Sequence, residues 1–410
     1  MPDSPKAAGG SAQPRAGRGR SALLGAMFLM ATSAIGPGFI TQTTTFTARI
    51  GATFAFVIVV STLVDIAVQM NVWRVIGVSG TRAQDLANRV LPGAGYVLAA
   101  LVVIGGLVFN IGNVAGTGLG LDAMLGLDFR IGGAISAVLA IAIFLSHRAG
   151  MLMDRIVVLL GFLMIAMTVY VAIVSDPPVG EALTQSVAPD NVNFFVITTL
   201  IGGTVGGYIT YAGAHRLVDS GVRGPEQAGT ITRSSITGIV VTAVMRTVLF
   251  LAVLGVATAG ANLATDNPPA AAFAAAAGEV GLRIFGVVFW SAAITSVIGA
   301  SYTSVSFLKT FSPAVERREN WFVVGFIAVS AAIFVIVEQA PKTLLIFAGA
   351  FNGLILPVGF GLLLWVAIRR RDLLGGYRYP RWLAVLGVAV WLLTLYLGWQ
   401  SLEGLAALWS

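Results

Sequence analysis

Two glycine-rich stretches interrupt otherwise apolar segments of this sequence. Residues 33–42 read SAIGPGFITQ, and residues 201–211 read IGGTVGGYITY. Glycine and proline break transmembrane helices, and a break exposes backbone N–H and C=O groups that lipid cannot satisfy. Glycine in a membrane helix also serves close packing, which is the simpler alternative. Two breaks at matching places in two halves of one chain instead predict inverted repeats, with a binding site between the breaks.

The composition excludes an ordinary soluble protein. The chain has 410 residues, of which 57% are hydrophobic and 10% are charged, and its mean hydropathy is +0.89. Soluble domains carry about 25% charged residues. The absence of cysteine rules out disulfides, thiolate metal sites and cysteine nucleophiles. No Ser–His–acid set or paired carboxylates lie within the spans, so we expect no enzyme and no bound cofactor.

The apolar segments predict an all-α integral membrane protein with about eleven spans, each long enough to cross a hydrocarbon core of about 30 Å. The spans are expected near residues 22–48, 52–73, 95–121, 131–146, 155–175, 194–215, 234–258, 283–308, 321–338, 342–368 and 382–402. The longest loops are expected around 176–193 and 259–282. The chain then divides into a disordered tail at 1–21, a first five-helix repeat at 22–175, a second, inverted repeat at 194–368, and a peripheral eleventh helix at 382–402.

The formal net charge of +7 has a topological meaning here. Most lysines and arginines fall on one side if the amino terminus is cytoplasmic, as the positive-inside rule requires. We therefore expect a multi-pass protein of the plasma membrane with its amino terminus in the cytoplasm and its carboxyl terminus outside. The lipid bilayer is its main partner, and nucleic-acid binding is not expected.

Two ionisable residues lie in the middle of predicted spans, Asp65 in the second and Arg246 in the seventh. Each charge is unfavourable in a bilayer unless it is paired. One hypothesis is a buried Asp65–Arg246 pair that holds the bundle together. The other is a direct role in substrate binding or ion coupling.

Short motifs along most of residues 22–368 resemble the natural resistance-associated macrophage protein (Nramp) family of divalent-metal transporters. The matching residues are Ala48, Arg49 and Gly51, then Gln69, Arg74, Gly77, Val78, Gly80, Asp85, Leu86 and Ala87, then Gly116 and Thr117, and Leu356 and Pro357. The resemblance implies a leucine-transporter-type fold, with ten helices in two inverted repeats (five plus five) and a peripheral eleventh helix. It also implies secondary transport by alternating access.

The metal ligands of that family are replaced in this chain. Its DPGN motif falls on Gly36, Pro37, Gly38 and Phe39, its methionine on Gly206, its histidine on Tyr208, and the glutamine before Leu-Pro on Ile355. Two acidic positions of the family's proton path fall on Asn110 and Asn113, which cannot titrate. Mg²⁺ requires oxygen ligands, and selection of Mn²⁺ or Fe²⁺ by a thioether requires the methionine. None of the family's divalent-metal ligands is therefore expected to operate here.

The remaining site suits a small organic molecule with a carboxylate. Gly36–Ile40 also resembles the GxG break of amino-acid transporters with the same fold, whose backbone N–H groups bind a substrate carboxylate. The predicted substrate-binding residues are Gly36, Gly38, Phe39, Thr41, Gln42, Asn110, Asn113, Gly206, Gly207 and Tyr208. By the same resemblance, Thr32, Ile35, Thr295 and Ser296 form a candidate Na⁺ site, and Asp65 is a candidate H⁺ carrier. Alternatively, Thr295 and Ser296 bond back to their own helix.

These observations predict a secondary active transporter for a small organic anion or an amino-acid-like solute, driven by Na⁺ or H⁺. A solute as compact as 5-oxoproline fits the class, although no residue selects that compound. The first alternative is a divalent-metal transporter for Mg²⁺ or Mn²⁺. The second is a membrane sensor or scaffold that transports nothing.

Overall fold

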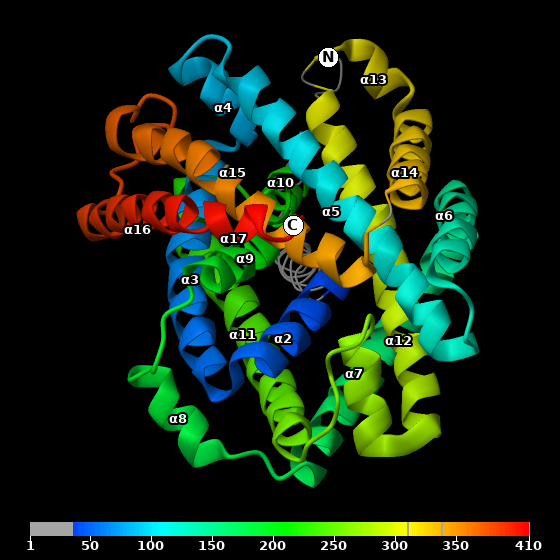
Figure 1. Cartoon of the computed structure of the whole chain (residues 1–410). Coiled ribbons are helices and arrows are strands. Elements are labelled where there is room, and N and C mark those ends of the chain that lie inside the picture. Colours follow the sequence, from blue (N-terminus) through cyan, green and yellow to red (C-terminus); the bar gives the residue numbers. More distant parts are fainter. Residues whose placement is uncertain (1–35, 310, 338, 410) are drawn as a thin grey trace, which may run out of the picture.

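The computed structural model describes residues 36–309, 311–337 and 339–409, except for the side chains of residues 147–158. The tail at 1–21, the first part of the first predicted span, and Thr32 and Ile35 lie outside the described residues. Within the described ranges the chain is helical and contains no strand. The helices, labelled as in Figure 1, are α2 (Pro37–Ile50), α3 (Phe54–Ser79), α4 (Ala83–Val90), α5 (Ala94–Leu125), α6 (Phe129–Leu145), α7 (His147–Val174), α8 (Val179–Val187), α9 (Phe194–Thr204), α10 (Ile209–Asp219), α11 (Ala228–Thr258), α12 (Pro268–Leu308), α13 (Pro313–Arg317), α14 (Glu319–Ile336), α15 (Pro341–Arg369), α16 (Arg381–Gln400) and α17 (Leu402–Ala406).

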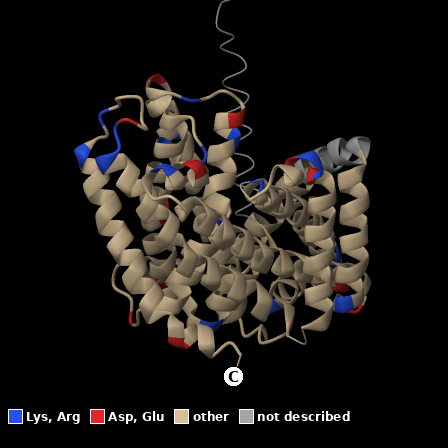
Figure 2. Cartoon of the chain, turned by 90° about the horizontal axis from the view of Figure 1, so that it is seen from above, with Lys and Arg blue, Asp and Glu red and all other residues tan. Residues whose placement is uncertain are grey.

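The predicted all-α membrane architecture is confirmed. Eight helical segments of the described chain are long and apolar enough to cross a membrane, and α7 with α8, bent by 104°, makes a ninth. Each of the eleven predicted spans has a helical counterpart. The numbers differ because residues 37–79 form one apolar segment that turns at Gly51 between α2 and α3, and because α6 has only 17 residues. Figure 2 shows the charged residues gathered at the rims of the bundle, with largely uncharged helices between them.

Two predicted loops contain helices. Residues 176–193 include α8, and α12 begins at Pro268, well before the expected start at 283. The early start has a local cause: the Asn267 side chain accepts a hydrogen bond from the N–H of Ala270, and Pro268 occupies the first helical position, where its missing N–H is harmless. The alanine-rich run that follows is helical up to a kink at Gly278 (φ 64°).

The broken span of α9 and α10 lies at the centre of the molecule. Its most apolar window is 94% buried, against 28% for α14 and 33% for α16, which are therefore peripheral. In Figure 1, α9 lies beside α15, and α5 runs along α12. Because lipid does not reach the central span, polar groups there can serve a site instead of facing hydrocarbon. The division into repeats at 22–175 and 194–368 stays a prediction.

Candidate functional site

The first break precedes α2. Gly36 is extended (ψ −171°), and α2 begins at Pro37 without a side-chain cap. The backbone N–H groups of Gly38 and Phe39 therefore lie in the first turn of a helix, where they have no intrahelical partner. The ring of Pro37 packs against Gly116 of α5, where any larger residue would overlap it. One proline and one glycine thus set the spacing between α2 and α5, and the start of α2 is buried in the protein interior.

The second break separates α9 from α10. Residues 205–208 form a turn in which Gly207 has a φ of +53°, a conformation that favours glycine. A side chain at Gly207 would also overlap the amide oxygen of Asn352 on α15. Tyr208 ends the turn, fully buried, and its ring meets that of Phe109 edge to face at 5.6 Å. The predicted break is therefore present, and backbone geometry and packing both require Gly207.

Glycines bring α9 into backbone contact with α15. A Cβ atom at Gly202 would overlap the carbonyl oxygen of Gly349, and one at Gly353 would lie 2.5 Å from the carbonyl oxygen of Thr198. Gln42 of α2 is inserted beside this contact, and its Nε2 donates to the carbonyl of Leu345 over 2.9 Å. Its Oε1 has no hydrogen-bond partner among the described residues. Gln42 therefore connects the two breaks through α15.

Arg246 of α11 lies directly beside the first break. Its Cζ is 4.4 Å from the ring centroid of Phe39, a cation–π distance, and both side chains are buried. Nη1 donates to Thr204 Oγ1 over 3.1 Å, at the last residue of α9. Nε and Nη2 have no hydrogen-bond partner among the described residues. A single guanidinium thus contacts residues at both breaks and keeps one donor edge free.

Asp65 of α3 is the counter-charge to Arg246. Both are almost fully buried, at 1% and 3% exposure. The carboxyl attracts the Arg246 charge and lies beside the Thr204 hydroxyl, but the two charges are not in ion-pair contact within the described structure. One carboxyl oxygen, Oδ1, has no hydrogen-bond partner there. The expected buried pair is therefore an indirect one, with Thr204 between its two members.

The amides at the former proton-path positions face different surroundings. Asn110 Nδ2 donates to Ser301 Oγ at 2.9 Å and to Ser330 Oγ at 3.0 Å, so it joins α5 to α12 and α14. Asn113 lies next to the Tyr208 hydroxyl. Neither its Nδ2 nor its Oδ1 has a hydrogen-bond partner by distance and angle among the described residues. Asn110 is thus held in a structural network, whereas Asn113 faces the second break with both polar atoms available.

The hydroxyls predicted for Na⁺ binding bond back to their own helix. Thr295 Oγ1 donates to the carbonyls of Ser291 and Ala292 at 3.0 Å, and Ser296 Oγ donates to Ala292 at 2.9 Å. This is the geometry of the helix-bonded alternative. The hydroxyl of Thr41, on α2, is fully buried and has no hydrogen-bond partner in the described chain.

A salt bridge and a hydrogen bond join the C-terminal end of α10 to α4. Arg82, at the start of α4, forms a salt bridge of 3.0 Å with Asp219, the last residue of α10. One turn earlier, His215 Nε2 accepts a hydrogen bond from the N–H of Ala83 at 3.2 Å. The second half of the broken span is therefore attached to α4 at its outer end, and Gly207 at its inner end packs closely against Asn352.

Sequence reasoning missed two residues of this arrangement. Thr204 links Arg246 to the second break, and Asn352 Nδ2 joins α15 to α5 by donating to the carbonyl of Gly105 over 3.0 Å. The available signal for Asn352 was an amide in the middle of an otherwise apolar span. Thr204 gave no signal, because a threonine that bonds back to its own helix is common in transmembrane helices.

Comparison with known proteins identifies the family. The sequence profile described as "Natural resistance-associated macrophage protein-like" matches residues 27–402. The chain therefore belongs to the Nramp family, and the resemblance inferred from its motifs is confirmed.

Relatives and solved structures agree with this assignment. The membrane protein YcsG of Bacillus subtilis is 53% identical over 391 residues, covering 95% of this chain and 96% of YcsG. A membrane protein of Haemophilus influenzae is 50% identical over 368 residues, covering 90% of this chain and 92% of that protein. Both are described as uncharacterised.

A manganese transporter of Eremococcus coleocola shares the fold. A crystal structure of one of its mutants has a TM-score of 0.73 at 18% sequence identity, covering 96% of this chain and 89% of the transporter. A crystal structure of its complex with an aromatic bis-isothiourea compound has a TM-score of 0.74 at 17% identity. The chain thus has an Nramp transporter fold. Among its described residues, no group of three or more His, Cys, Asp or Glu side chains is arranged to hold a metal ion.

Proposed function

We propose that this protein is a secondary active transporter of the cell membrane that carries a small organic anion with a carboxylate group. The observation that carries the proposal is the free Nε–Nη2 edge of the buried Arg246 guanidinium. An arginine binds a carboxylate through two parallel N–H groups, and a buried arginine needs such a partner. Phe39 belongs to the first turn of α2, whose free backbone N–H groups add donors for an anion.

Phe39, Asn113 and Tyr208 give the site its remaining chemistry. Phe39 covers one face of the guanidinium, so a ligand approaches through the guanidinium edge. Asn113 and Tyr208 supply neutral polar groups near the second break. A compact, partly polar solute such as 5-oxoproline or another small amino-acid-like anion matches this combination. The predicted binding residues Gly36, Gly38, Thr41, Gln42, Gly206 and Gly207 line or shape the two breaks.

Charge balance supports coupling to a cation. Without substrate, Asp65 and Arg246 offset each other; a bound carboxylate leaves the buried site with an excess negative charge. A co-transported H⁺ or Na⁺ restores neutrality, because an unbalanced charge within the bilayer is strongly unfavourable. Asp65 is the proposed proton carrier, and Thr295 with Ser296 is the alternative Na⁺ site.

Divalent-metal transport is the second candidate, and the shared fold favours it. The residues at the family's ligand positions oppose it. Gly36 and Gly206 have no side-chain atom that could bind a metal ion, and the Arg246 guanidinium stacks on the ring of Phe39. A fixed positive charge next to the site repels a divalent cation. The proposal therefore places the substrate carboxylate where other family members are expected to bind a metal ion.

Uptake by purified protein in proteoliposomes tests the proposal. Labelled small carboxylates, 5-oxoproline among them, and Mn²⁺ are offered under imposed Na⁺ or H⁺ gradients. We expect the parent protein to accumulate a carboxylate. Arg246→Lys keeps the charge but loses the bidentate hydrogen-bonding geometry, so its kcat/KM should fall at least tenfold. Arg246→Gln should show no uptake. Arg233→Gln, an exposed position on the same helix, is the matched control.

The outcomes separate the candidates. Accumulation of Mn²⁺ with no carboxylate uptake assigns the protein to metal transport and overturns the proposal. Absence of any uptake, in protein that retains its thermal transition, favours the sensor or scaffold alternative.

A further inference from the structure

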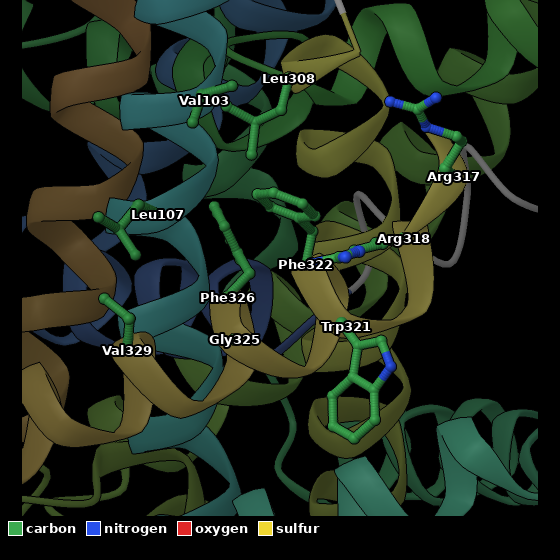
Figure 3. Close-up of a pocket in the computed structure, with 10 residues that line it drawn as sticks. All are labelled: Val103, Leu107, Leu308, Arg317, Arg318, Trp321, Phe322, Gly325, Phe326 and Val329. Carbon is green, nitrogen blue, oxygen red and sulfur yellow. The ribbon is translucent and has the colours of Figure 1, made fainter. Parts of the chain in front are cut away.

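A groove of about 900 Å³ opens on the outer surface of the bundle, between α5, the end of α12, and α14. Figure 3 shows Val103 and Leu107 of α5 facing Phe322 and Phe326 of α14 across it. Both helices belong to candidate membrane spans. The apolar part of the groove, between α5 and α14, therefore lies at the depth of the lipid tails and forms a concave surface for them.

One end of the groove is cationic. Arg317, the last residue of α13, and Arg318 beside it are exposed and line this end (Figure 3). Neither takes part in an ion pair within the described residues. The neighbouring Glu319 does not neutralise them, because it is paired with Lys309 at 2.8 Å. Glu316 is exposed and is not part of the groove.

The length of the groove matches one leaflet of a bilayer. Its residues on α14 extend to Val329, which places that end about 16 Å along the helix axis from Arg318. Half of a typical hydrocarbon core is about 15 Å. Trp321 lies one turn inside the arginines with 72% of its surface exposed, as expected of an aromatic residue at the membrane–water interface. The arginines thus lie at headgroup height and the apolar walls at acyl-chain depth.

We propose that this groove is a binding site for an anionic phospholipid. The headgroup phosphate pairs with Arg317 and Arg318, and an acyl chain lies between α5 and α14. Guanidinium groups bind phosphate through two N–H groups, and basic pockets at the membrane surface select anionic headgroups. Gly325 leaves the floor open, since a Cβ atom there would meet nothing within 4 Å.

A second groove provides an internal comparison. It has a volume of about 730 Å³, lies between the start of α5, α15 and α16, and is lined by residues without charge, such as Leu91, Val97, Leu362 and Leu395. Its size and apolar walls suit lipid tails equally well. No charged residue of the described chain lines it, so we expect it to bind anionic and zwitterionic lipids equally well.

Native mass spectrometry of the full chain, delipidated in mild detergent, tests the site. The probes are phosphatidylglycerol and phosphatidylcholine with the same acyl chains. The test variants are Arg317→Gln/Arg318→Gln, which removes the cations, and Gly325→Leu, which adds an apolar side chain at the floor of the groove, where a Cβ atom meets nothing within 4 Å. The matched controls are Arg371→Gln/Arg378→Gln, two exposed arginines elsewhere, and Gly161→Leu, another helix position where a Cβ meets nothing within 4 Å.

We expect one phosphatidylglycerol per chain to bind about tenfold more tightly than phosphatidylcholine. The double glutamine variant loses this preference, Gly325→Leu binds either lipid more weakly, and both controls behave as the parent does. Equal binding of the two lipids by the parent, or an unchanged preference in the double variant, overturns the proposal. A parent that is a dimer and a Gly325→Leu variant that is a monomer, with no change in lipid preference, would identify the groove as a subunit contact and would also overturn the proposal.

Discussion

Arg246 makes two interactions and leaves part of its guanidinium without a partner among the described residues. Its guanidinium stacks on Phe39, donates to Thr204, and retains a free edge. A buried charge with an unused donor edge is costly in the absence of a ligand. Asp65 reduces that cost without occupying the edge, because the two charges attract each other without ion-pair contact. At the residue scale, this unused donor edge is the feature on which the proposed carboxylate site rests.

Phe39→Leu is expected to weaken substrate binding while leaving the fold intact. Leucine keeps most of the apolar volume but removes the ring beneath the guanidinium, and a desolvated cation–π contact is worth about 2 kcal/mol. The KM for carboxylate uptake should rise by up to about 30-fold. Phe46→Leu, on the same helix, is the control, since its ring contacts Phe54 and Phe195 rather than an arginine. A KM that rises equally in both variants would show a packing effect only.

Asp65→Asn is expected to separate transport from its driving force. The amide resembles a permanently protonated carboxyl, so uptake driven by a proton gradient should be lost while exchange of labelled for unlabelled substrate continues. Proteoliposome assays with and without the gradient measure both. Thr295→Val/Ser296→Ala should keep gradient-driven uptake, since these hydroxyls bond within α12. The reverse pattern, with dependence on Na⁺, would assign coupling to Thr295 and Ser296.

At the scale of elements, the contact between α9 and α15 is the tightest part of the site. The two helices meet at glycines, and a larger residue on either side has no free space. This contact fixes where Thr204 ends α9 and where Asn352 reaches α5. The glycines at this contact thus determine where the polar groups of Thr204 and Asn352 lie.

Gly202→Ala is expected to destabilise the protein, because its methyl group would overlap the Gly349 carbonyl oxygen. Overpacking of this kind costs about 1–3 kcal/mol, which should lower the Tm of the detergent-solubilised protein by several degrees. Gly161→Ala is the control, because the added Cβ meets nothing within 4 Å. Its Tm should stay the same or rise, since alanine is the better helix former. An unchanged Tm in Gly202→Ala would mean that α9 and α15 can separate easily.

The glycine-rich stretches could be located from the sequence, but the residues that pack against them could not. Gly36, Pro37 and Gly38, and then Gly206 and Gly207, interrupt apolar runs; the structure shows the second interruption, and at the first it shows α2 beginning at Pro37. A break is a local property of the backbone, so local sequence reveals it. The linking role of Thr204 and the approach of Asn352 depend on how α11 and α15 pack, which periodicity does not encode. Likewise, hydropathy alone predicts loops at α8 and at the start of α12, where the structure has helices.

At the scale of the whole molecule, the orientation in the membrane is open to a direct test. The positive-inside rule predicts that Arg378 is cytoplasmic and Glu403 external, with the single span α16 between them. The chain has no cysteine, so Arg378→Cys and Glu403→Cys each introduce a single thiol. An impermeant maleimide added to intact cells should label only Glu403→Cys, and Arg378→Cys should react after permeabilisation. Labelling in the opposite order would invert the topology.

The half-helix α10 is a rigid segment with a flexible glycine, Gly207, at one end. Its 11 residues measure about 16 Å along the axis, from the Gly207 pivot to Asp219. A tilt of about 20° at the pivot displaces the far end by about 5 Å, enough to separate Asp219 from Arg82. The neighbouring half, α9, is in backbone contact with α15, whereas α10 meets α3 through the side chain of Trp73, which packs on Gly213. A tilt of α10 about Gly207 would therefore move its Asp219 end the most and leave α9 in place.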